Sequence, residues 1–239
     1  MRLAVTRPSE DAQKLTQGLV AQGHEVIAAP LMTIQFLNAP ELPQREWQAV
    51  LITSANALKA LANHSELGPL KSIPCCCVGP ASARLAADMG FSDIRVAGGG
   101  LVELQALVRR QLRPESGPLL YLSGEQISGN LGGDLAISGF ETVHVVLYRA
   151  VPETQLWQVL GQDIEQGRLD GVLLYSPRTA RIWQALMDRH GLSSKALHVL
   201  HYCLSANVAA ALPEHVLVKI AEYPEDAAML ALTGQETQR

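Results

Sequence analysis

The feature that most constrains the fold is a recurring unit: a short apolar run, then a small polar loop, then a helical pattern. Runs such as AVLIT at 49–53 and GVLLY at 171–175 are continuously apolar and do not alternate with polar residues. Strands buried on both faces have this composition. Strands that alternate with helices predict parallel sheets covered by helices on both sides. One large sheet or two smaller ones would satisfy the pattern equally well.

Composition narrows the class of protein. The 239 residues are 48% hydrophobic and 18% charged, and this length suits one large domain or two small ones. A formal net charge of -4 argues against a nucleic-acid partner, which usually meets a basic surface. No apolar run is long enough to cross a membrane, and the first residues become polar too soon for a signal peptide. We therefore expect a cytoplasmic protein.

Common catalytic and metal-binding motifs are missing from the sequence. Cys75, Cys76 and Cys77 are consecutive in a strand-like run, so their side chains would alternate between faces and could not surround one metal ion. The histidines are scattered, and no phosphate loop or nucleophile elbow appears. Three consecutive glycines at 98–100 are interpreted as a hinge or turn before a helix. We predict no metal site.

Most of the polar signal lies where predicted strands end and helices begin. Such loops present backbone N–H groups at the positive end of a helix, which can bind carboxylate or phosphate. In parallel sheets, ligands bind outside the carboxyl ends of the strands. For any single loop, ordinary helix capping is the alternative; the set as a whole favours a polar cleft that works by positioning its ligand. The segments are Thr6–Ser9, Thr53–Asn56, Gly79–Ser82, Leu122–Gly124, Ser176–Thr179 and Leu204–Asn207.

Several of these segments, in this order, resemble the uroporphyrinogen-III synthase family. The resemblance extends from the N-terminal region to about residue 212, and each fragment alone is weak. Its motifs are VTRP at 5–8, APLMTI at 29–34, ITSANA at 52–57, VGPASA at 78–83, YLSGE at 121–125, VLYRAVP at 146–152, YSPRTA at 175–180 and a segment centred on Ser205.

The resemblance implies two doubly wound, flavodoxin-like parallel-sheet domains joined by a two-stranded linker, with a cleft between them. Residues 1–35 and 152–239 would form a discontinuous first domain, and residues 36–151 an inserted second domain. The extended segments at 30–43 and 148–154 would make the two crossings. The family cyclises hydroxymethylbilane to uroporphyrinogen III with loss of water and inversion of the last ring. It needs no cofactor and commonly works as a monomer, which leaves room for a transient contact with the upstream hydroxymethylbilane synthase.

The resemblance also implies site residues. Tyr148 occupies the family's tyrosine position and is the candidate proton donor; the alternative is a packing tyrosine. Ser82 is expected to bind a substrate carboxylate, with a plain helix cap as the alternative. Arg149 and Arg181 are further, secondary candidates. The other proposed substrate-binding residues are Arg7, Ser54, Asn56, Ser123, Gly124, Ser176, Arg178, Thr179 and Ser205.

The sequence departs from the family pattern in two loops. At 201–207, Cys203 stands in place of a small glycine and Ala206 in place of a threonine, so that only Ser205 keeps a hydroxyl group. The segment Leu122–Gly124 lacks an arginine that many relatives carry. Two other interpretations therefore stay open: a non-catalytic two-domain relative that binds a small anion, and an unrelated doubly wound enzyme acting on phosphorylated compounds.

Overall fold

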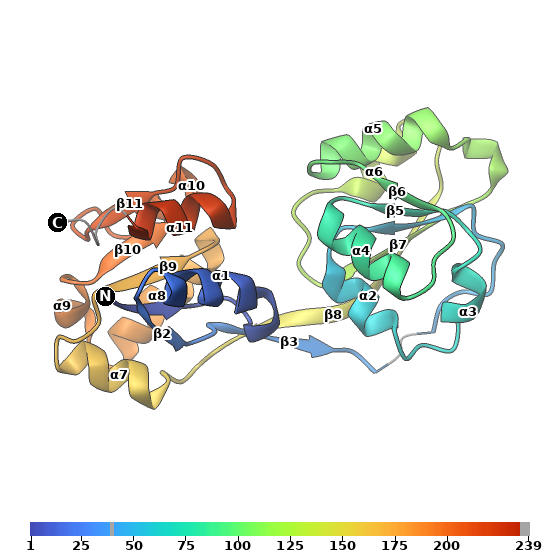
Figure 1. Ribbon diagram of the computed structural model, residues 1–239. Coiled ribbons are helices and arrows are strands. Elements are labelled where there is room, and N and C mark those ends of the chain that lie inside the picture. Colours follow the sequence, from blue (N-terminus) through green and yellow to red (C-terminus); the bar gives the residue numbers. More distant parts are fainter. Residues whose placement is uncertain (39–40, 235–239) are drawn as a thin grey trace. The chain divides into compact units, whose positions relative to one another are not determined.

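The computed structural model describes residues 1–38 and 41–234, and these form two compact units. Unit 1 consists of Met1–Thr33 and Val151–Arg239, and unit 2 of Ile34–Ala150 (Figure 1). Residues 39–40 and 235–239, which the predicted division assigned to the second and first domains, lie outside the described residues. Within the described part of the chain, no helix combines the length and apolar character that a bilayer crossing requires.

Unit 1 is built on a parallel sheet with strand order β11-β10-β9-β1-β2. This is the doubly wound order of flavodoxin-like folds, with the reversal between β1 and β9. Its strands are β1 (Arg2–Val5), β2 (Glu25–Ala28), β9 (Gly171–Leu174), β10 (Leu200–Cys203) and β11 (Val218–Ile220). Its helices are α1 (Ser9–Ala21), α7 (Gln158–Glu165), α8 (Pro177–Arg189), α9 (Ser193–Ala196), α10 (Ala206–Ala209) and α11 (Asp226–Gly234).

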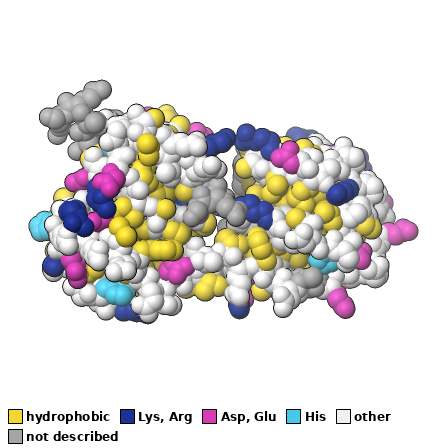
Figure 2. Space-filling model, turned by 60° about the horizontal axis from the view of Figure 1, so that its bottom comes forward, with side chains coloured by type: hydrophobic (Ala, Val, Ile, Leu, Met, Phe, Trp, Pro, Cys, Tyr) yellow, Lys and Arg dark blue, Asp and Glu magenta, His cyan; other side chains and the backbone are white. Residues whose placement is uncertain are grey.

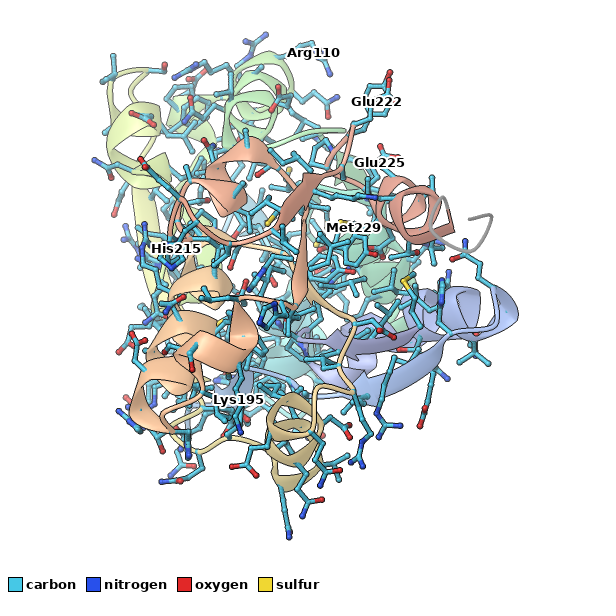
Figure 3. All side chains as sticks on the ribbon, turned by 90° about the vertical axis from the view of Figure 1, so that its left-hand side faces the viewer. Arg110, Lys195, His215, Glu222, Glu225 and Met229 are labelled. Carbon is cyan, nitrogen blue, oxygen red and sulfur yellow. The ribbon has the colours of Figure 1, made fainter. Side chains whose placement is uncertain are left out.

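Helices cover both faces of this sheet. Residues of α1 and α11 pack on the face of Leu3 and Val5, and α7 to α10 pack on the face of Ala4. Figure 3 shows Met229 on the inner side of α11, where it is fully buried, whereas Glu222 extends outward. Burial on both faces explains why the strands are continuously apolar.

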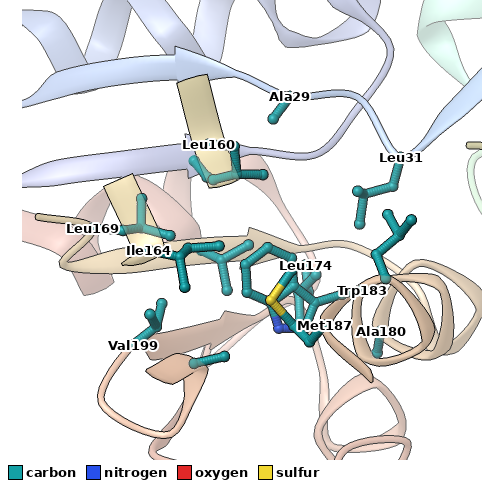
Figure 4. Packing of buried hydrophobic residues seen from close by; sticks show 14 of the residues in the cluster. Ala29, Leu31, Leu160, Ile164, Leu169, Leu174, Ala180, Trp183, Met187 and Val199 are labelled. Carbon is teal, nitrogen blue, oxygen red and sulfur yellow. The ribbon is translucent and has the colours of Figure 1, made fainter. Parts of the chain in front are cut away.

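The larger core of unit 1 surrounds Trp183, which is fully buried among residues such as Leu174 and Met187 (Figure 4). Its indole Nε1 donates to His201 Nε2 at 3.0 Å, so the buried ring leaves no donor unsatisfied. His201 is also buried, and desolvation lowers the pKa of its imidazole. The histidine is therefore a neutral partner of the core.

A buried carboxylate ties the start of the chain to its second half. Asp163 is fully buried and accepts from Arg2 Nε at 2.6 Å and from Arg168 Nη2 at 2.7 Å. Burial raises the pKa of Asp163, but the hydrogen bonds from the two arginines outweigh burial and hold that pKa below its usual value. The ion-pair network thus fixes β1 against α7.

Unit 2 contains a sheet with strand order β3-β8-β7-β4-β5-β6. The pairs from β8 to β6 are parallel. The strands are β3 (Met32–Phe36), β4 (Ala49–Ile52), β5 (Cys75–Cys77), β6 (Ile94–Val96), β7 (Leu119–Gly124) and β8 (Thr142–Pro152). The helices are α2 (Ala55–Leu61), α3 (Leu67–Leu70), α4 (Pro80–Asp88), α5 (Leu101–Gln111), α6 (Leu131–Ala136) and a 3-10 turn at Pro114–Ser116.

The faces of the second sheet are also covered, by α2, α3 and α4 on one side and by α5 and α6 on the other. Cys75 and Cys77 point to the first side and Cys76 to the second, all three buried. The α/β class with parallel sheets is therefore confirmed. The flavodoxin-like order holds for unit 1 alone: in unit 2 the parallel strands follow the other common doubly wound order, with β4 at the reversal beside β7.

The edge strand β3 runs against β8 in the opposite direction. Leu37 N donates to Leu147 O at 2.9 Å, and Glu153 N donates to Leu31 O at 2.9 Å. The two strands are therefore antiparallel. Both strands contain a boundary between the units, at 33/34 and at 150/151.

Candidate active site

The predicted site residues lie at the carboxyl ends of parallel strands in both sheets. In unit 2, Gly124 is the last residue of β7, and Tyr148 is its partner on the neighbouring strand β8. Ser54 follows the end of β4, and the loop before Ser82 follows the end of β5. Because the strands are parallel, their carboxyl ends lie at the same edge. In unit 1, neighbouring strands β10, β9 and β1 end just before the remaining predicted residues, which are Ser205, Ser176, Arg178, Thr179 and Arg7. Such edges are where α/β folds bind ligands.

A β-bulge positions the candidate proton donor. The β7–β8 register pairs Ser123 with Val146 and then Gly124 with Tyr148, so Leu147 is the extra residue. Leu147 is buried, whereas the Tyr148 side chain is half-buried and packs on the core beside α2 and α4. Bulges re-aim side chains in this way, often beside active sites. Without the bulge, Leu147 would lie opposite Gly124.

The Tyr148 ring lies against the backbone of Gly124. A Cβ atom on Gly124 would come within 2.7 Å of Cε2 and Cζ of the ring and 3.1 Å of its hydroxyl oxygen. A side chain at residue 124 is therefore incompatible with the present ring position. The next residue reinforces the pairing, because Glu125 N donates to Tyr148 O at 2.9 Å. Residue 124 must therefore be glycine if the Tyr148 ring is to keep this position.

Ser123 belongs to a hydrogen-bonded group on the opposite side of the sheet. Its buried Oγ lies 2.8 Å from Gly124 O and 2.6 Å from His144 Nε2. The His144 ring stacks on Tyr121 with centroids 4.7 Å apart. Partial burial lowers the pKa of His144, which favours the neutral ring. A hydroxyl has one proton, so donation to Gly124 O leaves Ser123 to accept from the imidazole. Its hydroxyl is already engaged within the protein.

The helix start after β5 has no capping side chain. Gly79 is the N-cap of α4 and supplies no capping side chain, and Pro80 occupies the first turn. The backbone N–H groups of the first turn are thus left uncapped by a side chain, and Ser82 lies among them, almost fully buried. By contrast, Ser54 Oγ accepts from Asn56 N at 3.2 Å, so α2 caps itself.

In unit 1 the helix start after β9 is closed by its own side chains. Ser176 Oγ accepts from Thr179 N at 3.1 Å, while Thr179 Oγ1 accepts from Ser176 N at 3.0 Å. This is a capping box, in which the side-chain oxygen of each residue accepts from the backbone N–H of the other. Ser205 caps the short helix α10 without a side-chain hydrogen bond. The predicted anion-binding role of these residues remains a prediction.

Arg7, predicted to pair with a substrate carboxylate, has an internal partner. Its Nη1 donates to Asp226 Oδ1 at 2.7 Å, and its guanidinium lies 4.7 Å from the centroid of the Tyr175 ring. Burial raises the pKa of the Tyr175 phenol, which therefore stays protonated. Asp226 opens α11, far along the chain. A substrate carboxylate would have to share Arg7 with Asp226.

Sequence reasoning missed His144 and Asp226. His144 was one of several scattered histidines, and only the β7–β8 register places it opposite Tyr121. Asp226 is separated from Arg7 by 219 residues, so no local pattern could have joined them.

Among the described residues, no group of three His, Cys, Asp or Glu side chains is arranged to hold a metal ion. On the visible face of unit 1, Lys and Arg side chains are interspersed with Asp and Glu (Figure 2).

Comparison with known proteins gives a consistent family match. The family model described as uroporphyrinogen-III synthase HemD matches residues 13–231. The uroporphyrinogen-III synthetase of Helicobacter pylori has a similar solved structure, with 18% identity, 100% of each chain covered and a TM-score of 0.66. A mutant uroporphyrinogen III synthase of Thermus thermophilus is also similar, with 18% identity, 100% of this chain and 99% of the other covered, and a TM-score of 0.60. No curated protein sequence matches this chain.

Proposed function

The chain belongs to the uroporphyrinogen-III synthase family of tetrapyrrole biosynthesis, and from this we propose that it closes hydroxymethylbilane to uroporphyrinogen III with loss of water. The match over 13–231 is the observation that carries the proposal. In enzyme terms the activity is that of a cyclising lyase. The reaction would take place in the cytoplasm, on a monomer that meets the upstream synthase only transiently.

The reaction has two steps that the protein must promote. The terminal hydroxyl group must leave as water, which gives an electrophilic azafulvene. The substituted carbon of the last pyrrole ring must then attack the azafulvene to give a spiro intermediate. The bond from that carbon to its original methylene bridge breaks and re-forms at the other α carbon of the ring, which loses its proton, so that the ring ends up inverted. Unassisted closure joins the ends directly and gives the type I isomer. The enzyme therefore has to hold a flexible chain in one conformation, which is a matter of positioning.

We assign the departure of water to Tyr148. Its phenol is a weak acid, with a reference pKa of about 10, and it can donate a hydrogen bond to the leaving oxygen. Two features support this role: the bulge that turns Tyr148 and not Leu147 toward Gly124, and the position of the ring at the carboxyl edge of the sheet. The alternative, a tyrosine that only packs on the core, predicts unchanged turnover when the hydroxyl group is removed.

We assign the acidic arms of the substrate to the loops at the carboxyl edges. The uncapped first turn of α4 with Ser82 is the strongest candidate in unit 2. Backbone N–H groups can hold a carboxylate there without a cationic side chain. Gly124 makes room for Tyr148, and its backbone remains a candidate ligand. The further proposed contributors are Ser54, Asn56, Ser123, Ser176, Arg178, Thr179, Ser205 and Arg7.

The test is a product assay with Tyr148→Phe. Freshly prepared hydroxymethylbilane is supplied, and the oxidised products are resolved by chromatography. Wild-type protein is expected to give type III product and the variant a kcat lowered by about tenfold to a hundredfold, with an unchanged circular dichroism spectrum. Wild-type protein that yields only the type I isomer of the protein-free control would refute the synthase activity and favour the non-catalytic alternative. Undiminished turnover of the variant would remove Tyr148 from its role as donor.

A further inference from the structure

A groove in unit 1 extends away from the predicted binding loops. It encloses about 290 Å³ between helix α8 and the segment Pro152–Thr154, which begins with the last residue of β8. On the helix side its lining begins at Arg178 and ends at Arg189. These two residues are eleven positions apart, so the groove follows the helix for roughly 16 Å at 1.5 Å per residue. It starts in the same turn as the capping box of Ser176 and Thr179.

The groove combines a basic rim with an apolar floor. Arg178, Arg181 and Arg189 line it, and Glu153 is the acidic residue among its lining. Ile182 supplies part of the apolar surface, together with Ala185 and Leu186 of the same helix. The positions 178, 181, 182, 185 and 189 recur every three or four residues, so they form one stripe of the helix. The local charge is positive although the whole chain is net negative.

The charged groups of the rim differ in how far they are already engaged. Arg189 Nη1 donates to Thr154 O at 2.6 Å, which fixes the far end of the groove. Glu153 accepts from Thr33 Oγ1 at 2.5 Å. Arg181 is exposed, and among the described residues it makes no hydrogen bond or ion pair. A planar guanidinium with available donors is well suited to a carboxylate.

We propose that this groove is a subsite for one carboxylate-bearing arm of the tetrapyrrole, with Arg181 as the residue that meets the carboxylate. The hydrocarbon part of the arm would lie on Ile182 and Leu186, and its charge would face the arginine. The inference rests on the proposed function and deepens it. It also supplies a local attraction that the net charge of -4 does not provide.

The experiment compares Arg181→Glu with Arg181→Lys, with Ala185→Phe and with a distant control, Arg110→Glu. Arg110 is exposed in the last turn of α5 in unit 2 (Figure 3). KM and kcat are measured with hydroxymethylbilane. Binding of uroporphyrin III, a stable porphyrin with the same acidic arms, is measured by titration calorimetry. The second readout does not depend on turnover.

Arg181→Glu is expected to raise KM and the porphyrin Kd about tenfold, because attraction is replaced by repulsion, with kcat changed less than twofold. Ala185→Phe fills the groove without changing charge and is expected to weaken binding similarly. Arg181→Lys keeps the charge but loses the planar fork, so its Kd is expected to lie between those of wild type and Arg181→Glu, whereas Arg110→Glu stays within about twofold of wild type. Equal binding by Arg181→Glu and Arg110→Glu would overturn the subsite while leaving the synthase activity standing. Wild-type protein without type III product would refute the proposed function, and the porphyrin titration would still decide whether the groove binds carboxylates.

Discussion

Replacing Gly124 by alanine tests whether the backbone at the end of β7 positions the Tyr148 ring. The added Cβ would lie 2.7 Å from two ring carbons, whereas ordinary contacts begin at 3.4 Å, so the ring must retreat by about 0.7 Å. No left-handed backbone conformation is required at Gly124, so alanine adds bulk without backbone strain. Tyr148 is half-buried and can swing outward, which limits the loss of stability to about 1 kcal/mol.

Turnover should suffer more than stability does. A misplacement close to 1 Å at a reacting group can cost about a hundredfold in rate. We therefore expect Gly124→Ala to lower kcat by about tenfold to a hundredfold in the product assay. Urea unfolding serves as the measure of stability, so that a folding defect is recognised as such.

A double-mutant cycle then shows whether Gly124 acts through the phenol. If alanine at 124 acts by moving the hydroxyl group of Tyr148, it should have little further effect in the Tyr148→Phe background, because neighbouring residues that work as a unit are not additive. Full additivity would assign the loss to another property of Gly124, such as contact with the substrate. Wild-type turnover by Gly124→Ala would refute the positioning argument altogether.

Two further predictions concern stability. Asp163→Asn removes the buried charge that accepts from both of its arginine partners, and should lower the free energy of unfolding by about 2–3 kcal/mol in urea titrations; a loss below about 0.5 kcal/mol would contradict the network. His201 has a pKa lowered by burial from its ordinary 6.5, so the unfolded chain takes up the proton first and stability should decline as pH falls below about 6.5, by up to about 1.4 kcal/mol per pH unit. His201→Gln keeps an acceptor for the indole of Trp183 but cannot titrate, so unfolding at pH 7.5 and 5.0 should show a smaller decline than wild type. Equal declines would exclude His201 as the source.

The fold class could be predicted because burial on both faces leaves a direct mark on the sequence. Runs such as AVLI at 49–52 and GVLL at 171–174 are strands with every residue buried. The strand order of unit 2 could not be predicted in the same way. Both doubly wound orders use the same strands, loops and helices, and they differ only in which side of the first strand each crossover takes. The pattern of apolar and polar residues along the chain is therefore the same for both strand orders.

The edge on which the candidate site lies followed from the sequence, because polar loops after parallel strands must share one edge. The contacts within the site did not follow from it. The bulge at Leu147 depends on a register shift between two strands. The pair formed by Arg7 and Asp226 depends on how α11 packs against the sheet. The sequence suggested that the helix starts were open to anions, but at Ser176 and Thr179 the side chains close the first turn themselves.

The discontinuity of unit 1 has a consequence for synthesis on the ribosome. Strand β1 pairs with β9, whose partner residues begin at Gly171, while the strands and helices of unit 2 are contiguous along the chain. At roughly 5–20 residues per second, β1 waits on the order of ten seconds or longer for that neighbour. The inserted unit can complete its sheet during this interval. During this interval the nascent N-terminal segment can pair β1 with β2, but the other edge of β1 has no partner strand.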